Sequence, residues 1–389
     1  MGIPTRKLRA RAVSAWLPAL MGLAIGVPVA VGSAQRATPP GQAAAASPGA
    51  VTAKAVSAAN AFLGTLGPAE KEKVMFAFGS SQRTVWSNLP SGIFQRNGLR
   101  LGDMTPQQRT AAMALVAAAL SREGYEKVTN IMNGDEVLKN AGGGRTGGRP
   151  GGAPPPGGAA PPPGGGGGRG GGRGGGGGLT FGSDQYYISL LGAPSTTTPW
   201  MLQFGGHHLA INVTVVGPNS VMTPSLPAAQ PASYTLNGQT IRPLGDENDK
   251  GFTLINALNP EQQKQAILTY EVRDLVLGPG NDGKVIQPEG IRASALDAKQ
   301  QALLLDIAHE WVGILNDEAA TRKMAELKAN LPQTYFALSG STKNGGLAYY
   351  RIQGPTVLIE YAPQQGDLDH IHTIYRDPTN DYGARLLGQ

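Results

Sequence analysis

Apolar residues recur with helical spacing soon after residue 50. Between Val56 and Leu66 they fall on one face, which is the pattern of an amphipathic helix packed on a core. Gly67 and Pro68 follow, and they predict the end of this helix and the start of the next, because proline suits the first helical position. The folded part of the chain is therefore expected to begin with helices.

A short helix-start pattern occurs four times, beginning at Leu66, Met104, Leu258 and Leu296. In the last three copies an N-cap residue is followed three positions later by glutamine, an arrangement in which each residue satisfies a free backbone amide. The first two copies are 38 residues apart, and so are the last two. The equal spacing indicates a repeated unit.

Strand signals show the same repetition. Tyr187 is followed by glycine five and nineteen positions later, and Tyr335 is followed by glycine at the same two distances. We infer an α+β fold with an internally duplicated unit of two or three helices followed by an antiparallel strand meander, all within a single compact domain. The duplicated domain spans 51–389, with a first half of about 51–230 and a second half of about 245–389.

Alternation of apolar and polar residues predicts individual strands. In 207–216 the alternation places His208 on the polar face, and a further strand is predicted at 370–375 with His370 and His372 on one face. Because the two meanders of a duplicated fold tend to lie near each other, we expect these polar faces to approach.

Residues 141–178 interrupt the first half. This tract holds 22 glycines and 7 prolines among its 38 residues. It has too little apolar surface to offset the entropy of ordering, so we expect a disordered Gly/Pro/Arg-rich insertion that acts as a flexible spacer. Residues 35–50, rich in Ala, Pro, Gly and Ser, are predicted to be a flexible lead-in.

Residues 1–34 have the pattern of a secretory signal peptide: a basic start, an apolar run and small residues at the end. Cleavage after Ala34 would make the bacterial protein secreted or periplasmic, with no stable membrane insertion. An uncleaved anchor is the alternative, since the apolar run approaches the length that spans a bilayer.

The formal net charge of +6 first suggests a nucleic-acid-binding protein. The signal and the 141–178 tract, however, hold eight basic residues and no acidic one. The rest of the chain carries 25 basic and 27 acidic residues, so we expect no nucleic-acid partner. RNA binding through the Arg/Gly tract is a remaining alternative, although the tract has no aromatic residue for base stacking.

The chain has no cysteine, which excludes disulfides, thiolate metal sites and cysteine nucleophiles. The patterns Gly-x-Ser-x-Gly, Ser-x-x-Lys and His-Glu-x-x-His are absent as well. Any metal must therefore be bound by histidine, carboxylate, amide or backbone oxygen.

Four of the five histidines occur as two close pairs: His207 beside His208, and His370 two positions before His372. Two histidines at alternate strand positions point to the same side, so one metal ion can bind both. With Glu360, which the internal alignment places on the facing strand, His208, His370 and His372 are predicted to bind a divalent or transition metal ion, namely zinc, iron, copper or manganese.

Other polar residues near these pairs are candidates for catalysis or substrate binding. Asp369 is predicted to be a general base or to orient a ligand, and Glu360 to be a second catalytic carboxylate. Arg83, Trp86 and Arg376 lie beside predicted turns and are predicted to line a substrate cleft, with an arginine holding an anionic group. Structural contacts with backbone carbonyls are the alternative for the arginines.

The remaining histidines have simpler interpretations. His207 lies on the apolar face of its strand, so we expect a hydrogen-bonded core histidine rather than a ligand. His309 lies on the same helix face as Leu305 and Val312, which predicts a packing role.

Five short motifs occur along the chain: Arg83-Thr84-x-Trp86, Met104-Thr105-Pro106-Gln107, Gly206-His207-His208-Leu209-x-x-Asn212, Gln353-Gly354-Pro355-x-x-x-x-Glu360-Tyr361 and His370-Ile371-His372-x-x-x-Arg376-Asp377. Together they resemble the bacterial family labelled domain of unknown function 3500. The resemblance covers about residues 55–383 and supports the histidine positions. It implies a secreted, uncharacterised protein and no particular reaction, and the Gly/Pro/Arg tract departs from the family pattern.

The leading hypothesis is an exported metal-dependent enzyme, hydrolytic or oxidative, that acts on a small-molecule or envelope-derived substrate. The alternative is a non-catalytic periplasmic or envelope module that binds a ligand or has a structural role. In that case Trp86, Trp200, Tyr349 and Tyr350 would form an apolar recognition surface.

Overall fold

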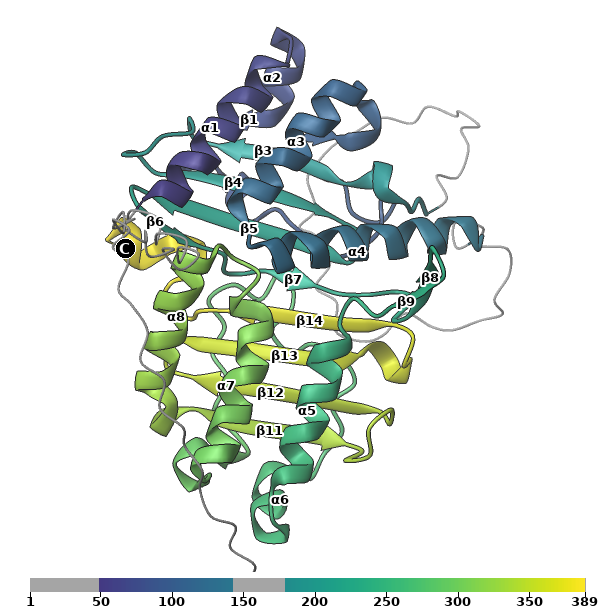
Figure 1. The fold of residues 1–389 in the computed structure, drawn as a ribbon, viewed down its shortest axis with the longest axis vertical. Coiled ribbons are helices and arrows are strands. Elements are labelled where there is room, and N and C mark those ends of the chain that lie inside the picture. Colours follow the sequence, from purple (N-terminus) through teal and green to yellow (C-terminus); the bar gives the residue numbers. More distant parts are fainter. Residues whose placement is uncertain (1–48, 143–178, 389) are drawn as a thin grey trace, which may run out of the picture. The chain divides into compact units, whose positions relative to one another are not determined.

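The computed structural model describes residues 49–142 and 179–388. The predicted signal peptide, nearly all of the lead-in and all but the first two residues of the Gly/Pro/Arg tract lie outside these residues. The described residues all belong to one compact unit, Ala46–Gln389. Figure 1 shows helices packed on two sheets, which confirms the predicted α+β class.

Among its described residues, the first half contributes four α-helices and all seven strands of one sheet. Its helices are α1 (Ala50–Gly64), α2 (Pro68–Val74), α3 (Pro106–Ala119) and α4 (Arg122–Asn140). The Thr105 cap acts as the sequence predicts, since its side chain accepts a hydrogen bond from the Gln108 amide at the start of α3. The Ser121 side chain accepts one from the Gly124 amide at the start of α4.

The first sheet has seven strands in the order β1-β3-β4-β5-β6, with β2 paired to β3 and β7 paired to β5. All pairs are antiparallel except β1 with β3. Its strands are β1 (Met75–Phe76), β2 (Leu99–Arg100), β3 (Tyr187–Leu191), β4 (Trp200–Gly206), β5 (Leu209–Val216), β6 (Asn219–Val221) and β7 (Leu226–Pro227). A separate hairpin joins β8 (Tyr234–Leu236) to β9 (Gln239–Ile241).

The second half contains the helices α5 (Gly245–Ala257), α6 (Pro260–Ala266), α7 (Ala298–Val312) and α8 (Asp317–Asn330). Its antiparallel sheet runs β10 (Ile291–Arg292), β11 (Tyr335–Gly340), β12 (Ala348–Gly354), β13 (Val357–Pro363) and β14 (Ile371–Arg376). Short 3-10 segments lie between these elements and after β14: η1 (Ser81–Thr84), η2 (Leu101–Asp103), η3 (Ser183–Gln185), η4 (Ala293–Ala295), η5 (Leu331–Gln333), η6 (Gln364–Gly366) and η7 (Asp381–Leu387).

Matched contacts occur at matched positions of the two halves. Gly98 precedes β2 with φ +108° and Gly290 precedes β10 with φ +90°. A Cβ on Gly98 would lie 2.5 Å from the Ile188 carbonyl oxygen, and one on Gly290 would lie 2.2 Å from that of Phe336. Both positions therefore require glycine. Such pairs are what an internal duplication would produce, and the duplication itself stays an inference.

One hydrophobic core runs through both halves. Helices α1, α3 and α4 cover one face of the first sheet, and α5, α7 and α8 cover one face of the second (Figure 1). A smaller cluster lies on the other faces, where residues from the loops 77–98 and 268–290, such as Trp86 and Leu277, pack against Met201 and Ile374. None of the helices in the described part of the chain is long and apolar enough to cross a membrane.

The halves meet along a seam beside β14. Figure 1 shows β7 lying between β5 and β14. Isolated bridges join Ser225 to Tyr375 and Ala229 to Ile371, so the segment around β7 hydrogen-bonds to β14. This segment links the first sheet to the second, and it brings the turn between β4 and β5 close to the start of β14.

The histidine-bearing strands differ slightly from the prediction. The strand expected at 207–216 begins at Leu209, because Gly206 pairs with Leu209 and leaves His207 and His208 as a two-residue hairpin turn. The strand expected at 370–375 is β14, one residue later. The alternation pattern could not separate a strand from the tight turn that precedes it.

Candidate metal site

Three imidazoles from both halves converge at the seam. His208 comes from the β4–β5 turn, His370 directly precedes β14, and His372 is the second residue of β14. The Nε2 atoms of His208 and His370 are 2.7 Å apart, and those of His370 and His372 are 3.2 Å apart. One ring nitrogen from each lies within 4.8 Å of the others, so the three residues could hold a metal ion.

The turn that carries His208 is held in place by its backbone. His208 has a left-handed φ of +62°. Its amide donates to the Asn88 carbonyl at 3.0 Å, and its carbonyl accepts from the Ala228 amide at 2.8 Å. The Arg96 guanidinium donates to the Gly206 carbonyl at 2.8 Å and to two carbonyls of the Asn88 loop. These contacts turn the imidazole toward β14.

Strand pairing positions the other two imidazoles. Ile371 exchanges two backbone hydrogen bonds of 2.9 Å with Ala229, and its side chain belongs to the main core. The Thr373 hydroxyl accepts from the Trp311 indole at 2.9 Å on the helix side. Because neighbouring strand residues alternate, His370 and His372 point away from the helices.

A carboxylate from the loop 268–290 orients one of the rings. His372 Nδ1 lies 3.0 Å from Asp274 Oδ1. Burial alone would raise the pKa of Asp274, but the hydrogen bond and charge interaction with His372, together with hydrogen bonds from the Leu275 amide and Gln364, outweigh it and lower that pKa. The carboxylate therefore keeps the proton on Nδ1 and leaves Nε2 of His372 with a lone pair, as carboxylate–histidine–metal arrangements do.

Burial keeps two of the rings neutral. Desolvation, with the neighbouring imidazoles, lowers the pKa of His208 well below 6.5 and lowers that of His370 to about 4. Both rings are thus unprotonated at neutral pH, which is the form that binds metals. The buried Nδ1 of His208 has no hydrogen-bond partner among the described residues. The chemistry of the site matches a cation bound between facing lone pairs.

His207 lies beside this group without joining it. It is 4% exposed, its Nδ1 is 2.6 Å from Asp135 Oδ1, and its ring lies 3.6 Å from that of His208. The Tyr186 hydroxyl donates to its carbonyl. It is therefore a hydrogen-bonded core histidine, as expected.

The two carboxylates proposed for this site are engaged elsewhere. Glu360 is buried on β13, where Oε1 accepts from the Val276 amide and the Tyr349 hydroxyl and Oε2 accepts from the Leu277 amide. Its register partner is Ile374, whereas His372 pairs with Ala362. Glu360 therefore anchors the 268–290 loop and does not belong to the imidazole group.

Asp369 is next to His370 in the sequence, but its side chain makes its contacts elsewhere. It is exposed, and Oδ1 accepts from the Ala232 amide at 2.9 Å. No contact joins it to the three imidazoles among the described residues. The carboxylate that does contact a ring, Asp274, comes from an irregular loop and carries no signal in the sequence.

The residues expected to line a substrate cleft form a buried structural network. Arg376 is 3% exposed and donates to the carbonyls of Leu277 and Gly278, which matches the structural alternative. The Trp86 indole donates to the Tyr382 hydroxyl at 2.7 Å, and the Arg83 guanidinium lies 5.8 Å from the ring of Tyr382.

Two further expectations are wrong. The four residues of the alternative recognition surface are all buried, so they form no surface: Trp86, Trp200, Tyr349 and Tyr350. His309, for which a packing role was expected, is exposed on α7. Asn88 was not anticipated, although its Nδ2 lies 3.2 Å from His372 Nε2.

Comparison with known proteins gives a family without an assigned activity. Residues 48–384 match the family model described as "Protein of unknown function (DUF3500)". No curated protein and no solved structure matches the chain. The matched segment covers nearly the whole of the chain and includes all three converging histidines. The chain belongs to this family of proteins of unknown function.

Proposed function

We propose that the protein is a metal-dependent enzyme that binds one metal ion through His208, His370 and His372. The observation that carries this proposal is the convergence of three ring nitrogens, with the pKa values of His208 and His370 lowered so that both rings are neutral. The Asp274 carboxylate contacts Nδ1 of His372 rather than Nε2, the atom that faces His370. Three protein ligands leave a position for water or substrate, which distinguishes catalytic from structural metal sites.

The donor set favours some metals over others. Imidazole nitrogen suits zinc, copper and iron, whereas manganese prefers oxygen ligands. Glu360 is held away by its own hydrogen bonds, so no carboxylate completes an oxygen-rich set. Zinc, copper or iron is therefore the proposed ion. The Asn88 side chain lies beside the site with its amide nitrogen 3.2 Å from His372 Nε2, so it is placed as a hydrogen-bond donor.

Hydrolysis is the reaction that needs the fewest chemical groups in addition to these residues and the metal. A metal with an open position lowers the pKa of its bound water and polarises a carbonyl or phosphoryl oxygen. With copper or iron the same ligands would support an oxidation. The proposed substrate is a small or envelope-derived molecule, in keeping with the predicted export of the chain.

The first test is the metal content of the exported form, purified without chelator and measured by inductively coupled plasma mass spectrometry. We expect about one ion per chain in the parent and almost none after His370→Ala with His372→Ala. His309→Ala, which removes an exposed histidine, is the matched control and should keep the metal. Circular dichroism reports whether the variants fold.

A folded parent that stays below stoichiometric metal after reconstitution with zinc, copper and iron would contradict the proposal. Catalysis is tested separately with ester, amide and phosphoester substrates, with and without chelation. Metal binding without turnover on any of them would favour the non-catalytic module instead.

A further inference from the structure

One polar side chain beside the three imidazoles has no role yet in the proposed metal site. Asn88 is 7% exposed, and its Nδ2 lies 3.2 Å from Nε2 of His372. The amide donates to the imidazole, because Asp274 keeps the His372 proton on Nδ1 and leaves a lone pair on Nε2. Among the described residues, this is the one hydrogen bond of the Asn88 side chain. It uses the same lone pair that would bind a metal ion.

The backbone holds Asn88 in this place although the segment around it is irregular. Its own carbonyl accepts from the His208 amide at 3.0 Å. The carbonyls on either side, those of Ser87 and Leu89, both accept from the guanidinium of Arg96, at 2.7 and 2.6 Å. Three successive carbonyls are therefore fixed, and the Asn88 side chain can move only by rotation about its own bonds.

Holding this loop requires a buried charge. Every hydrogen bond of the Arg96 guanidinium among the described residues goes to a backbone carbonyl, and its buried Nη1 has no partner there. Burial lowers the pKa of Arg96 to about 10, so the guanidinium is still charged at neutral pH. A buried cation without a carboxylate is unfavourable. The contacts that it makes instead fix the position of the Asn88 loop beside the His208 turn.

A metal ion bound by the imidazoles would change what Asn88 can contact. Nε2 of His372 would bind the ion, so its lone pair would no longer accept from the amide. A buried N–H group left without an acceptor is unfavourable. An atom 3.2 Å from one ligand nitrogen lies beside the coordination sphere, because metal–nitrogen bonds are only about 2 Å long. The amide is therefore close enough to donate to a further ligand of the same ion.

We propose that Asn88 selects the substrate group that binds the metal ion: an oxygen that also accepts a hydrogen bond, as in a carboxylate, a carbonyl or a phosphoryl group. This inference rests on the proposed function and names the class of substrate. An oxygen bound to a metal keeps a lone pair for the amide, whereas the coordinating nitrogen of an imidazole does not. During hydrolysis the same donor stabilises the negative charge that develops on the oxygen.

The test uses the exported form of the chain loaded with cobalt(II), whose visible absorption changes when a further ligand binds to the ion. Acetate and imidazole are titrated separately. In Asn88→Ala we expect acetate to bind about tenfold more weakly, because one hydrogen bond is lost, and imidazole to bind as in the parent. Asn344→Ala, at an exposed asparagine, is the matched control and should bind both ligands like the parent.

The difference between the two ligands separates this role from a structural one. Loosening of the whole site would weaken acetate and imidazole alike, and that result would overturn the proposal, as would an unchanged acetate affinity. Asn88→Leu, which is similar in size and has no donor, replaces the alanine variant if circular dichroism shows that the latter does not fold. Absence of cobalt absorption in the parent would contradict the metal site itself, and with it this proposal.

Discussion

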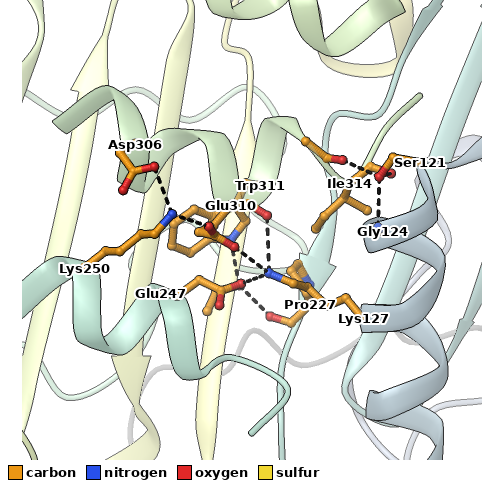
Figure 2. Close-up of polar contacts among 12 residues, drawn as sticks. Ser121, Gly124, Lys127, Pro227, Glu247, Lys250, Asp306, Glu310, Trp311 and Ile314 are labelled. Carbon is orange, nitrogen blue, oxygen red and sulfur yellow. Dashed lines mark hydrogen bonds and ion pairs between the residues drawn. The ribbon is translucent and has the colours of Figure 1, made fainter. Parts of the chain in front are cut away.

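Two buried polar clusters join the halves of this protein, and they are built on opposite principles. In one, shown in Figure 2, Lys127 on α4 contacts Glu247 on α5 and Glu310 on α7, and Lys250 contacts Glu310 at 2.6 Å. In the other, three imidazoles face one another. The first cluster pairs each cation with a carboxylate, whereas the second brings like groups together, with ring nitrogens of neighbouring imidazoles 2.7 and 3.2 Å apart.

The electrostatics follow this difference. Burial alone would lower the pKa of Lys127, but its two carboxylates outweigh it and raise that pKa, so the ammonium stays charged inside the protein. Burial lowers the pKa of His208 with no carboxylate in contact to oppose it. One oxygen of Glu247 is the exception in the ion network, since it has no partner among the described residues. Charges that are paired within the protein indicate a structural role, whereas neutral imidazoles that converge with no carboxylate between them indicate a ligand.

The largest effect is expected from breaking the ion network. Lys127→Met leaves Glu247 buried without its cation and should lower the free energy of unfolding by about 3–5 kcal/mol. Lys250→Met, at a more exposed lysine, should cost about 1 kcal/mol or less. Urea unfolding measures both. Equal losses in the two variants would show that burial does not separate them, and metal binding should survive in each folded variant.

A smaller effect is expected when the carboxylate that orients the His372 ring is removed. Asp274→Asn removes the carboxylate that holds the His372 proton on Nδ1 and should weaken metal affinity by about 10–100-fold, with little change in stability. Asp369→Asn is the matched control, because its carboxylate binds a backbone amide instead. Competition with a chelating dye measures the affinity. A greater loss in Asp369→Asn would restore that residue to the site.

The smallest effect is expected in the pH dependence of the free energy of unfolding, which distinguishes the imidazole group from the ion network. The pKa of histidine is near 6.5 in the unfolded chain and about 4 for folded His370, so the unfolded state binds more protons between these values. The free energy of unfolding of the metal-free protein should therefore fall as the pH falls from 6.5 to 4. The difference in the free energy of unfolding between the parent and the His370→Gln variant should shrink as the pH falls through this window. Urea titrations at each pH measure it.

Glu310 is expected to act in a lower pH window. Burial would raise its pKa, but Lys127 and Lys250 outweigh this and lower it, so its contribution is present above about pH 4.5 and is lost below it. The difference between the parent and Glu310→Gln should stay constant from pH 6.5 to 5. A change in that range would mean that the two clusters titrate together.

Features that depend on neighbouring residues were predictable. The Gln108, Gln262 and Gln300 caps form as expected, because a capping box joins residues only three positions apart. The shared direction of His370 and His372 was predictable for the same reason, since it follows from the two-residue period of a strand. Their convergence with His208 rested on the inferred duplication.

Features that depend on distant contacts were not predictable. Asp274 lies 98 residues before His372, in a loop without a periodic pattern, so nothing in the sequence associates the two. Glu360 was assigned to the site because the internal alignment placed it on the polar face of the facing strand. Its hydrogen bonds to the amides of Val276 and Leu277 show that this side chain anchors a loop.

By itself the sequence determined the helix starts, the alternation of the strands, the absence of thiolate ligands and the pairing of the histidines, because each depends on residue type and short spacing. Only the tertiary structure decided which polar groups are used by the protein and which are left for a ligand. That outcome depends on the packing of segments far apart in the sequence, 84 residues for Glu360 and Val276 and 162 for His208 and His370. The packing gives Arg376 and Glu360 partners within the fold and leaves ring nitrogens of the three imidazoles facing each other.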